Sequence, residues 1–106
     1  MDVSLDESAA GSTHRLRVGD TVSIRLAETP TTGYRWSLDV DESRLRVDQD
    51  EFRAAGDARG AGGERLVVVT ALAPGATTLR LAKSRSWTPG AVAEVVVDLD
   101  VAEQGA

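Results

Sequence analysis

The chain has no cysteine, and it contains histidine, lysine, tyrosine and phenylalanine only once each. Without cysteine there can be no disulfide, no thiol nucleophile and no cysteine-based metal site. The single histidine, His14, lies beside Arg15 with no nucleophile at a telling spacing, so we expect it at the surface. No nucleophile and base stand out as a pair. The sequence therefore predicts a protein that is not an enzyme and has no catalytic residues.

Basic charge is also scarce, because the net charge is −5 and the arginines are scattered between acidic residues. A nucleic-acid partner is disfavoured, since such binding needs clustered Lys and Arg. There is no apolar run long enough to cross a membrane. The first residues lack the basic and apolar regions of a signal peptide, which predicts a cytoplasmic protein as the sequence stands. A periplasmic or secreted location stays open if a leader has been removed.

Metal and nucleotide motifs are missing as well. Asp48-Gln49-Asp50 has part of the spacing of a calcium loop, but the central glycine and the terminal glutamate of that loop are absent. The carboxylates between Asp39 and Glu51 are best interpreted as a solvated face rather than a glycosidase pair. Neither a P-loop nor a dinucleotide fingerprint is present. We therefore predict no metal and no cofactor.

What the chain does have is apolar residues that alternate with polar ones, a period of two that is typical of half-buried strands. The alternating sets are Val22, Ile24 and Leu26; Tyr34, Trp36 and Leu38; Leu79 and Leu81; and Val95, Val97, Leu99 and Val101. The segment from Leu66 to Leu72 is apolar on both faces, which predicts a central strand covered on both sides. Helical periodicity is absent, and Asp39 to Arg46 could form one helical turn at most.

Turn signals divide these segments at Val18-Gly19-Asp20, Pro74-Gly75 and Pro89-Gly90. With 106 residues of which 42% are apolar, the chain is long enough for one core, and we expect a single domain, 1–106. The spacing predicts an all-β protein, an immunoglobulin-like β-sandwich of about seven or eight short antiparallel strands. Trp36 is expected to pack in its core, and the protein is expected to be a monomer.

Three polar segments lie between the predicted strands, and we interpret them as loops that could bind a partner. In the first, Pro30 fixes φ and Gly33 can adopt a positive φ before the next strand. This predicts a pre-ordered tip that exposes the hydroxyls of Thr31 and Thr32. Pre-ordering reduces the entropy lost on binding. An ordinary polar hairpin end is the alternative interpretation.

The other two segments are a glycine-rich stretch, Gly60-Ala61-Gly62-Gly63, and Arg85-Ser86-Trp87. The first belongs to a longer Gly- and Ala-rich loop that we expect to be mobile, and flexibility alone could explain it. Trp87 lies in a loop rather than in an alternating strand. Tryptophan and arginine dominate the hot spots of protein interfaces, although Trp87 could also fold back onto the sandwich.

Taken together, the three segments resemble the chagasin-type inhibitors of cysteine peptidases, and the resemblance covers roughly Val18 to Val101. The first loop of that family typically reads Asn-Pro-Thr-Thr-Gly followed by Tyr or Phe, and here it reads Thr29-Pro30-Thr31-Thr32-Gly33-Tyr34. The second loop is glycine-rich, as in residues 60–63. The third loop has Arg-Pro-Trp where this chain has Arg85-Ser86-Trp87. The chain thus departs from the family at Thr29 and Ser86.

The resemblance implies an immunoglobulin-like sandwich with three functional loops at one end and a papain-like cysteine peptidase as partner. It implies reversible, non-covalent inhibition, in which the loops wedge into the active-site cleft. The residues it implies for partner binding are Thr29, Pro30, Thr31, Thr32, Gly33, Tyr34, Gly60, Ala61, Gly62, Gly63, Arg85, Ser86 and Trp87. The alternative is an interaction or assembly module on the same scaffold with a partner that is not a peptidase.

Overall fold

The computed structural model describes residues 2–29, 32–54, 62–85 and 87–103, apart from the side chains of residues 88 and 89. Within these ranges the chain forms one short 3₁₀ helix, η1 (Glu7–Ala9), and eight strands. The strands are β1 (Asp2–Leu5), β2 (Thr13–Arg17), β3 (Thr21–Glu28), β4 (Arg35–Asp39), β5 (Leu45–Ala54), β6 (Gly63–Ala71), β7 (Gly75–Arg85) and β8 (Thr88–Ala102). In these described parts, no helix is long and apolar enough to span a membrane.

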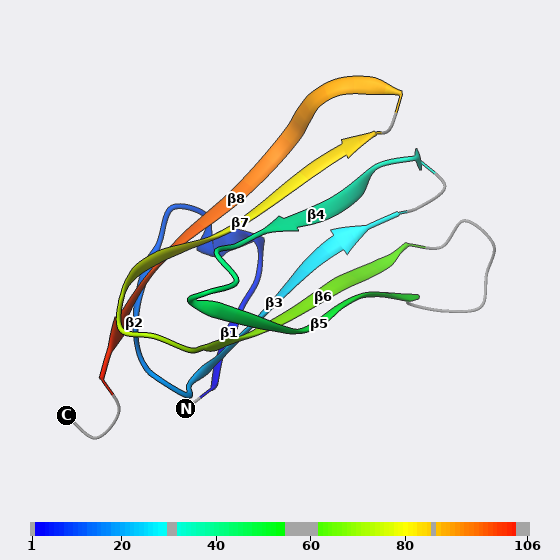
Figure 1. Cartoon of the computed structure of the whole chain (residues 1–106). Helices are drawn as coiled ribbons and strands as arrows, with labels where there is room; N and C mark the ends of the chain where they lie inside the picture. The colour runs from blue at the N-terminus through cyan, green and yellow to red at the C-terminus, as the bar shows by residue number, and fades with distance from the viewer. Residues whose placement is uncertain (1, 30–31, 55–61, 86, 104–106) are drawn as a thin grey trace.

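The strands form two four-stranded sheets that pack face to face (Figure 1). One sheet has the order β1-β3-β6-β5, and the other has the order β2-β8-β7-β4. The chain passes from the first sheet to the second between β3 and β4. This arrangement confirms the predicted all-β, immunoglobulin-like sandwich.

The core lies between the sheets and is built by the alternating residues that the sequence pattern singled out. Strand β3 contributes Val22, Ile24 and Leu26, and all three side chains are buried. Beside them in the same sheet, β6 contributes Val67, Val69 and Ala71. The opposite sheet faces them with Leu79 and Leu81 of β7 and Val95, Val97, Leu99 and Val101 of β8. Trp36 of β4 joins the same cluster, as predicted. Because side chains alternate across a strand, every second residue reaches this core.

Strand β6 lies between β3 and β5, so the prediction of a central strand is confirmed. It ends at Ala71, one residue earlier than the apolar pattern suggested. Its outward-facing residues Leu66 and Thr70 are buried too, although the described residues form no third layer. Arg46 of β5 lies over this face and donates to the Thr70 hydroxyl at 3.4 Å. The cover on the outer face therefore includes a long polar side chain rather than another sheet.

The prediction of short and wholly antiparallel strands is wrong in two respects. β1 pairs with β3 and β2 pairs with β8 in parallel, whereas the other pairs are antiparallel. The chain achieves this by crossing through η1 from the edge of one sheet to the edge of the other. In addition, β7 has 11 residues and β8 has 15. His14, which we expect at the surface, lies half-buried in β2, where its Nε2 is 2.8 Å from the Ser12 hydroxyl.

Two of the predicted turns are confirmed, and the one at Pro89-Gly90 is wrong. The turn at Val18-Gly19-Asp20 separates β2 from β3, and the turn before Gly75 separates β6 from β7. Pro89-Gly90 does not close a loop, because both residues lie within β8. The ladder between β7 and β8 is nevertheless irregular there, and Gly90 has a φ of 86°. A glycine at that angle avoids the strain that a side chain would impose. In the 39–46 region, the Leu45 amide donates to the Asp41 carbonyl at 2.9 Å and closes the single expected turn.

Strand β5 is an exposed edge, and a register shift between Val47 and Gln49 interrupts its pairing with β6. Asp48, at the bulge, accepts hydrogen bonds from the Thr70 hydroxyl and, at 2.7 Å, from Arg46. These contacts hold the pKa of Asp48 below its usual value. Bulges and charged side chains on an edge strand discourage pairing with other chains.

A core truncation should show how much the sandwich depends on this packing. Leu81 of β7 is fully buried at the centre of the core, so Leu81→Ala removes apolar contacts and leaves a cavity. We expect the free energy of unfolding to fall by about 2–5 kcal/mol. Equilibrium denaturation followed by circular dichroism measures the change. A loss below about 0.5 kcal/mol, the level of an ordinary surface substitution, would contradict the assigned core.

Candidate functional site

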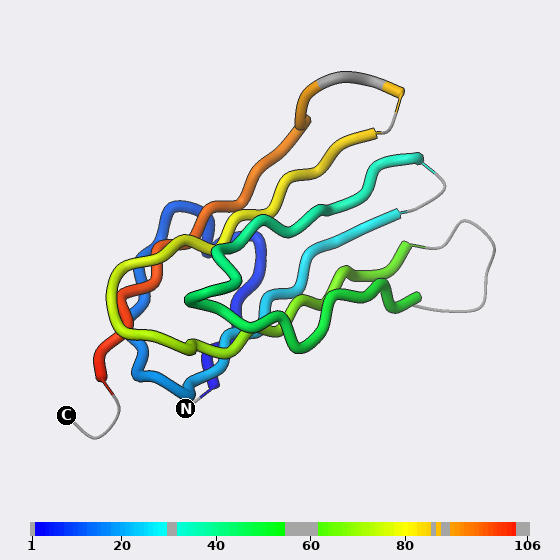
Figure 2. Tube along the Cα trace, in the orientation of Figure 1, coloured from blue at the N-terminus to red at the C-terminus, as the bar shows by residue number. Residues whose placement is uncertain are grey.

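The ends of β3, β5 and β7 and the starts of β4, β6 and β8 lie together at one end of the sandwich (Figure 1). The start of β1 and the end of β8 lie toward the other end. Figure 2 traces β3 running toward this loop end and β4 running back from it, one in each sheet. The described parts of the predicted functional loops therefore share one end of the molecule.

The first loop is closed by hydrogen bonds within itself. The carbonyl oxygen of Thr29 accepts from the Thr32 amide at 3.0 Å and from the Thr32 hydroxyl at 2.7 Å. The same hydroxyl is 3.4 Å from the Tyr34 amide nitrogen, which donates to it. Gly33 has a φ of 81°, which confirms the predicted left-handed glycine. The Thr32 hydroxyl was expected to be available to a partner, but in the structure it braces the loop.

The third loop holds an aromatic and cationic stack. The Arg85 guanidinium lies over the Tyr34 ring, with its central carbon 3.9 Å from the ring centroid. It also faces the Trp87 ring at 5.6 Å. Stacking of a guanidinium on aromatic faces is favourable and orients the planar group. Trp87 is 65% exposed, so it does not fold back to cap the sandwich.

Close contacts join the loops to one another. A Cβ on Gly33 would overlap the Trp87 ring, so the third loop packs directly on the backbone of the first. A Cβ on Gly62 would lie 3.0 Å from the Thr29 hydroxyl, which places the end of the second loop against the start of the first. Gly63 at the start of β6 leaves no room for a Cβ beside the Arg53 carbonyl and the Phe52 ring. The glycines thus permit approaches that side chains would block.

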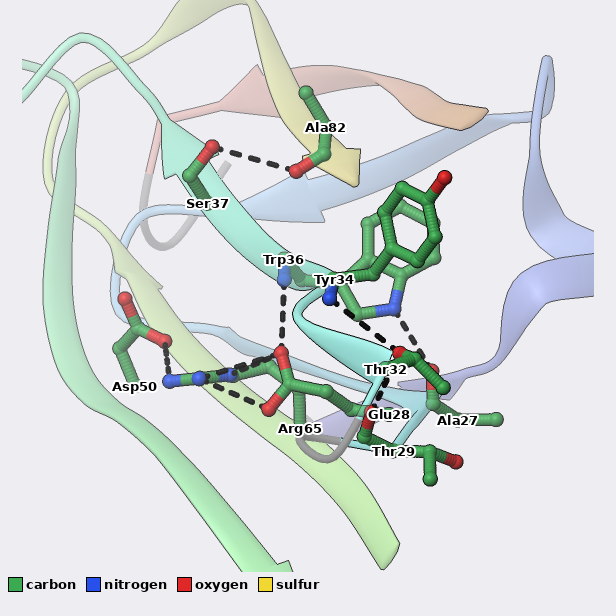
Figure 3. Close-up of polar contacts among 10 residues, drawn as sticks. All are labelled: Ala27, Glu28, Thr29, Thr32, Tyr34, Trp36, Ser37, Asp50, Arg65 and Ala82. Carbon is green, nitrogen blue, oxygen red and sulfur yellow. Dashed lines mark hydrogen bonds and ion pairs between the residues drawn. The ribbon is translucent and has the colours of Figure 1, made fainter. Parts of the chain in front are cut away.

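Beneath the first loop lies a buried ionic contact that the sequence interpretation missed (Figure 3). Glu28 is the last residue of β3, and its side chain is fully buried. Its Oε1 accepts from the Trp36 amide of β4 at 2.8 Å, and its Oε2 is 3.0 Å from Nη2 of Arg65 in β6. The available signal was the period of two: Val22, Ile24 and Leu26 point inward, so the next inward position is Glu28.

The described side chains at the loop end suit contact with a partner. Among the residues that the structure describes, no three acidic or histidine side chains gather as a metal site. The visible loop end consists of backbone and glycine, an exposed tryptophan and a stacked arginine. Exposed tryptophan and arginine side chains are typical of surfaces that bind another macromolecule. Fold and site together define a binding protein of the immunoglobulin-like class that presents its loops at one end.

Comparison with known proteins identifies the family. A model of the chagasin family of peptidase inhibitors, I42, matches residues 15–101. The chain is 33% identical over 84 residues to chagasin from Trypanosoma cruzi, covering 74% of this chain and 76% of chagasin. It is 29% identical over 89 residues to amoebiasin-2 from Entamoeba histolytica, covering 81% of this chain and 72% of that protein. The chain belongs to the chagasin family; it is a peptidase inhibitor and not an enzyme.

A solved structure supports the same fold. The crystal structure of the cysteine protease inhibitor EhICP2 from Entamoeba histolytica superposes with a TM-score of 0.87 at 24% identity, covering 95% of this chain and 96% of that one. At that level of identity the likeness shows the fold. The two proteins thus share the β-sandwich fold.

The predicted contact residues fall into two groups. The structure brings Thr29, Thr32, Gly33, Tyr34, Gly62, Gly63, Arg85 and Trp87 to one end of the sandwich. Pro30, Thr31, Gly60, Ala61 and Ser86 lie outside the described residues. The role of each residue in binding stays a prediction. The visible contacts nevertheless show that the first loop touches both of the others.

The contact between Gly33 and Trp87 can be tested by adding one methyl group. Gly33→Ala should push the Trp87 ring out of its position, because the new Cβ would occupy the space of the ring. Gly11 has the same φ of 81° with open space around it, so Gly11→Ala imposes the backbone strain alone. We expect both variants to lose about 1 kcal/mol of stability. Only Gly33→Ala should shift the indole NMR signal of Trp87. A shift of equal size in both variants would contradict the packing.

Proposed function

We propose that the chain inhibits papain-like cysteine peptidases reversibly and without a covalent bond, by placing its three loops across the active-site cleft. The observation that carries the proposal is the exposed Trp87, held between the Arg85 stack and the Gly33 backbone. An exposed aromatic residue costs solvation unless a partner covers it, and fixed aromatics with a neighbouring arginine are typical anchors of tight interfaces. Membership of the chagasin family supplies the class of partner.

The first loop would enter the cleft beside the catalytic cysteine and histidine of the peptidase. Its bonds between Thr29, Thr32 and Tyr34 hold the backbone in a closed turn before any partner arrives. A loop that is already ordered loses less entropy on binding. It also resists extension into the geometry that a peptidase needs for attack on a peptide bond. Rigidity therefore accounts both for affinity and for survival of the inhibitor.

The other two loops would flank this wedge. Arg85 and Trp87 would pack on the primed side of the cleft, and the glycine-rich loop would lie along the non-primed side. A structure of PbICP-C solved in complex with falcipain-2 superposes on this chain with a TM-score of 0.68 at 18% identity, covering 94% of this chain and 99% of that one. That complex shows a protein of this fold bound to falcipain-2, which supports the choice of partner. We expect an interface of about 800 Å² on each partner.

Titration of papain with the purified protein tests the proposal directly. A fluorogenic peptide reports residual activity, and gel electrophoresis shows whether the inhibitor is cut. We expect a stoichiometric loss of activity at nanomolar concentration, with the inhibitor intact and full activity recovered on dilution. Absence of inhibition at about 10 μM, which corresponds to a binding free energy weaker than about −7 kcal/mol, would reject papain-like peptidases of broad specificity as partners. The scaffold would then be an interaction module with another partner.

Truncation of the aromatic anchor gives a sharper test. Trp87→Ala should weaken inhibition of papain at least about tenfold, because a hot-spot residue contributes about 2 kcal/mol or more. The fold should remain, since the Trp87 side chain is largely exposed. Val92 lies on the same hairpin and is 57% exposed, so Val92→Ala is the matched control and should inhibit like the parent. If Trp87→Ala also inhibits like the parent, the third loop plays no part in binding.

A further inference from the structure

Glu28 occupies a position where the strand pattern calls for an apolar residue. The inward-facing residues of β3 are Val22, Ile24, Leu26 and then Glu28, which is 1% exposed. Arg65 occupies the equivalent place on β6, because Val67 and Val69 face the core two and four residues further on. Ionised side chains are rarely buried, since removal from water costs several kcal/mol unless they are paired. The buried carboxylate of Glu28 is therefore expected to have a specific structural role.

The contacts of Glu28 join three strands from both sheets. Arg65, with a side chain 14% exposed, donates from Nη2 to Glu28 Oε2 at 3.0 Å and from Nε to Oε1 at 3.4 Å. The Trp36 amide of β4 donates to Oε1 at 2.8 Å. Figure 3 shows this carboxylate between the two donors, with Asp50 of β5 on the far side of Arg65 at 3.2 Å. Glu28 thus connects β3 and β6 in one sheet to β4 in the other.

These contacts hold both ends of the first loop. Glu28 immediately precedes Thr29, where the loop leaves the first sheet, and Trp36 lies just beyond Tyr34, where the loop has joined the second. A second bond spans the same gap, because the Trp36 indole donates from Nε1 to the Ala27 carbonyl at 2.9 Å. The segment between these anchors is therefore tied at each end to a partner in the opposite sheet.

We propose that Glu28 is a positioning residue of the inhibitor: by bridging the Trp36 amide and Arg65 it fixes the spacing of the loop ends and keeps residues 29–34 an inhibitory wedge rather than a substrate. The proposal rests on the proposed function, since it explains how the first loop stays rigid inside a peptidase. A loop whose anchors loosen samples extended conformations, and extended backbone is what a peptidase cleaves. Glu28 touches no peptidase atom in this scheme, so it acts through the loop.

Glu28→Gln is the informative variant because it preserves shape. Glu28 Oε1 accepts from the Trp36 amide and from Arg65 Nε, and Oε2 accepts from Arg65 Nη2, whereas an amide has a single acceptor oxygen. If that oxygen takes the place of Oε1, the amide NH₂ faces Nη2 of Arg65, which is also a donor. The variant therefore loses the 3.0 Å bond to Arg65 and loosens the anchor that this bond holds in place. Val97→Ala serves as the matched control, because Val97 is fully buried in β8 and pairs with Leu79 within the core.

We expect Glu28→Gln to inhibit papain at least about tenfold less tightly than the parent, since pre-ordering of the loop is lost. Under excess papain it should be cut within residues 29–34, as mass spectrometry of the fragments will show. Val97→Ala should unfold at lower denaturant concentration yet inhibit within about threefold of the parent and stay uncut in that loop, because its defect lies far from the anchors. Arg65→Gln should also weaken inhibition. The double variant Glu28→Gln, Arg65→Gln should lose less than the product of the two single effects, because both variants break one interaction.

Hydrogen exchange of the Trp36 amide supplies a readout that does not depend on a peptidase. In Glu28→Gln this amide should exchange at least about tenfold faster, whereas Val97→Ala should leave its rate relative to neighbouring core amides unchanged. Inhibition, loop cleavage and Trp36 exchange all at the level of the parent would overturn the proposal, as would equal losses in Glu28→Gln and Val97→Ala. If the parent itself fails to inhibit papain, the proposed function is wrong. In that case, the hydrogen-exchange rate of the Trp36 amide in Glu28→Gln is the measurement that tests whether Glu28 fixes the loop ends.

Discussion

The loop end of the sandwich depends on one buried ion pair, Glu28 with Arg65. In the middle of the molecule, apolar side chains hold the sheets together without direction. At the point where β3 leaves one sheet and β4 joins the other, a directed contact is needed, and the carboxylate supplies it by accepting the Trp36 amide at 2.8 Å. Such a pair contributes little net stability against an apolar replacement, because desolvation offsets the attraction. What it adds is a defined geometry at the root of the first loop.

Beyond the Glu28–Arg65 pair, the three loops also contact one another. The first loop closes on the Thr29 carbonyl, and its Gly33 receives the ring of Trp87. Gly62 approaches Thr29 from the second loop. Residues separated by more than fifty positions in the chain thus meet at one surface, and each contact depends on a residue that lacks a side chain. Complementarity to a partner would arise from this mutual packing of the described residues.

The sequence predicted most of the sandwich because alternation reports directly on which face of a strand is buried. Ile24, Leu81 and Val97 stand at positions that only a buried strand explains, and Trp36 follows the same period. The parallel pairing of the two N-terminal strands was missed, because the alternation of buried and exposed residues does not report the direction of a strand. The sequence interpretation missed Glu28 and Arg65 for another reason. A charge at an inward position is ordinarily interpreted as the end of a buried strand, and the tertiary contact shows instead that Glu28 is buried against Arg65.

Thr29, where this chain departs from the family motif, does not weaken the turn of the first loop. The family typically carries asparagine there, whose side chain could brace the turn. In this chain the bonds that close the turn use the Thr29 carbonyl and the Thr32 hydroxyl and amide, so they do not require a particular side chain at 29. The Thr29 side chain instead lies toward Gly62. Rigidity of the first loop therefore rests on its own backbone turn and on Glu28 beneath it, which makes threonine compatible with an ordered wedge.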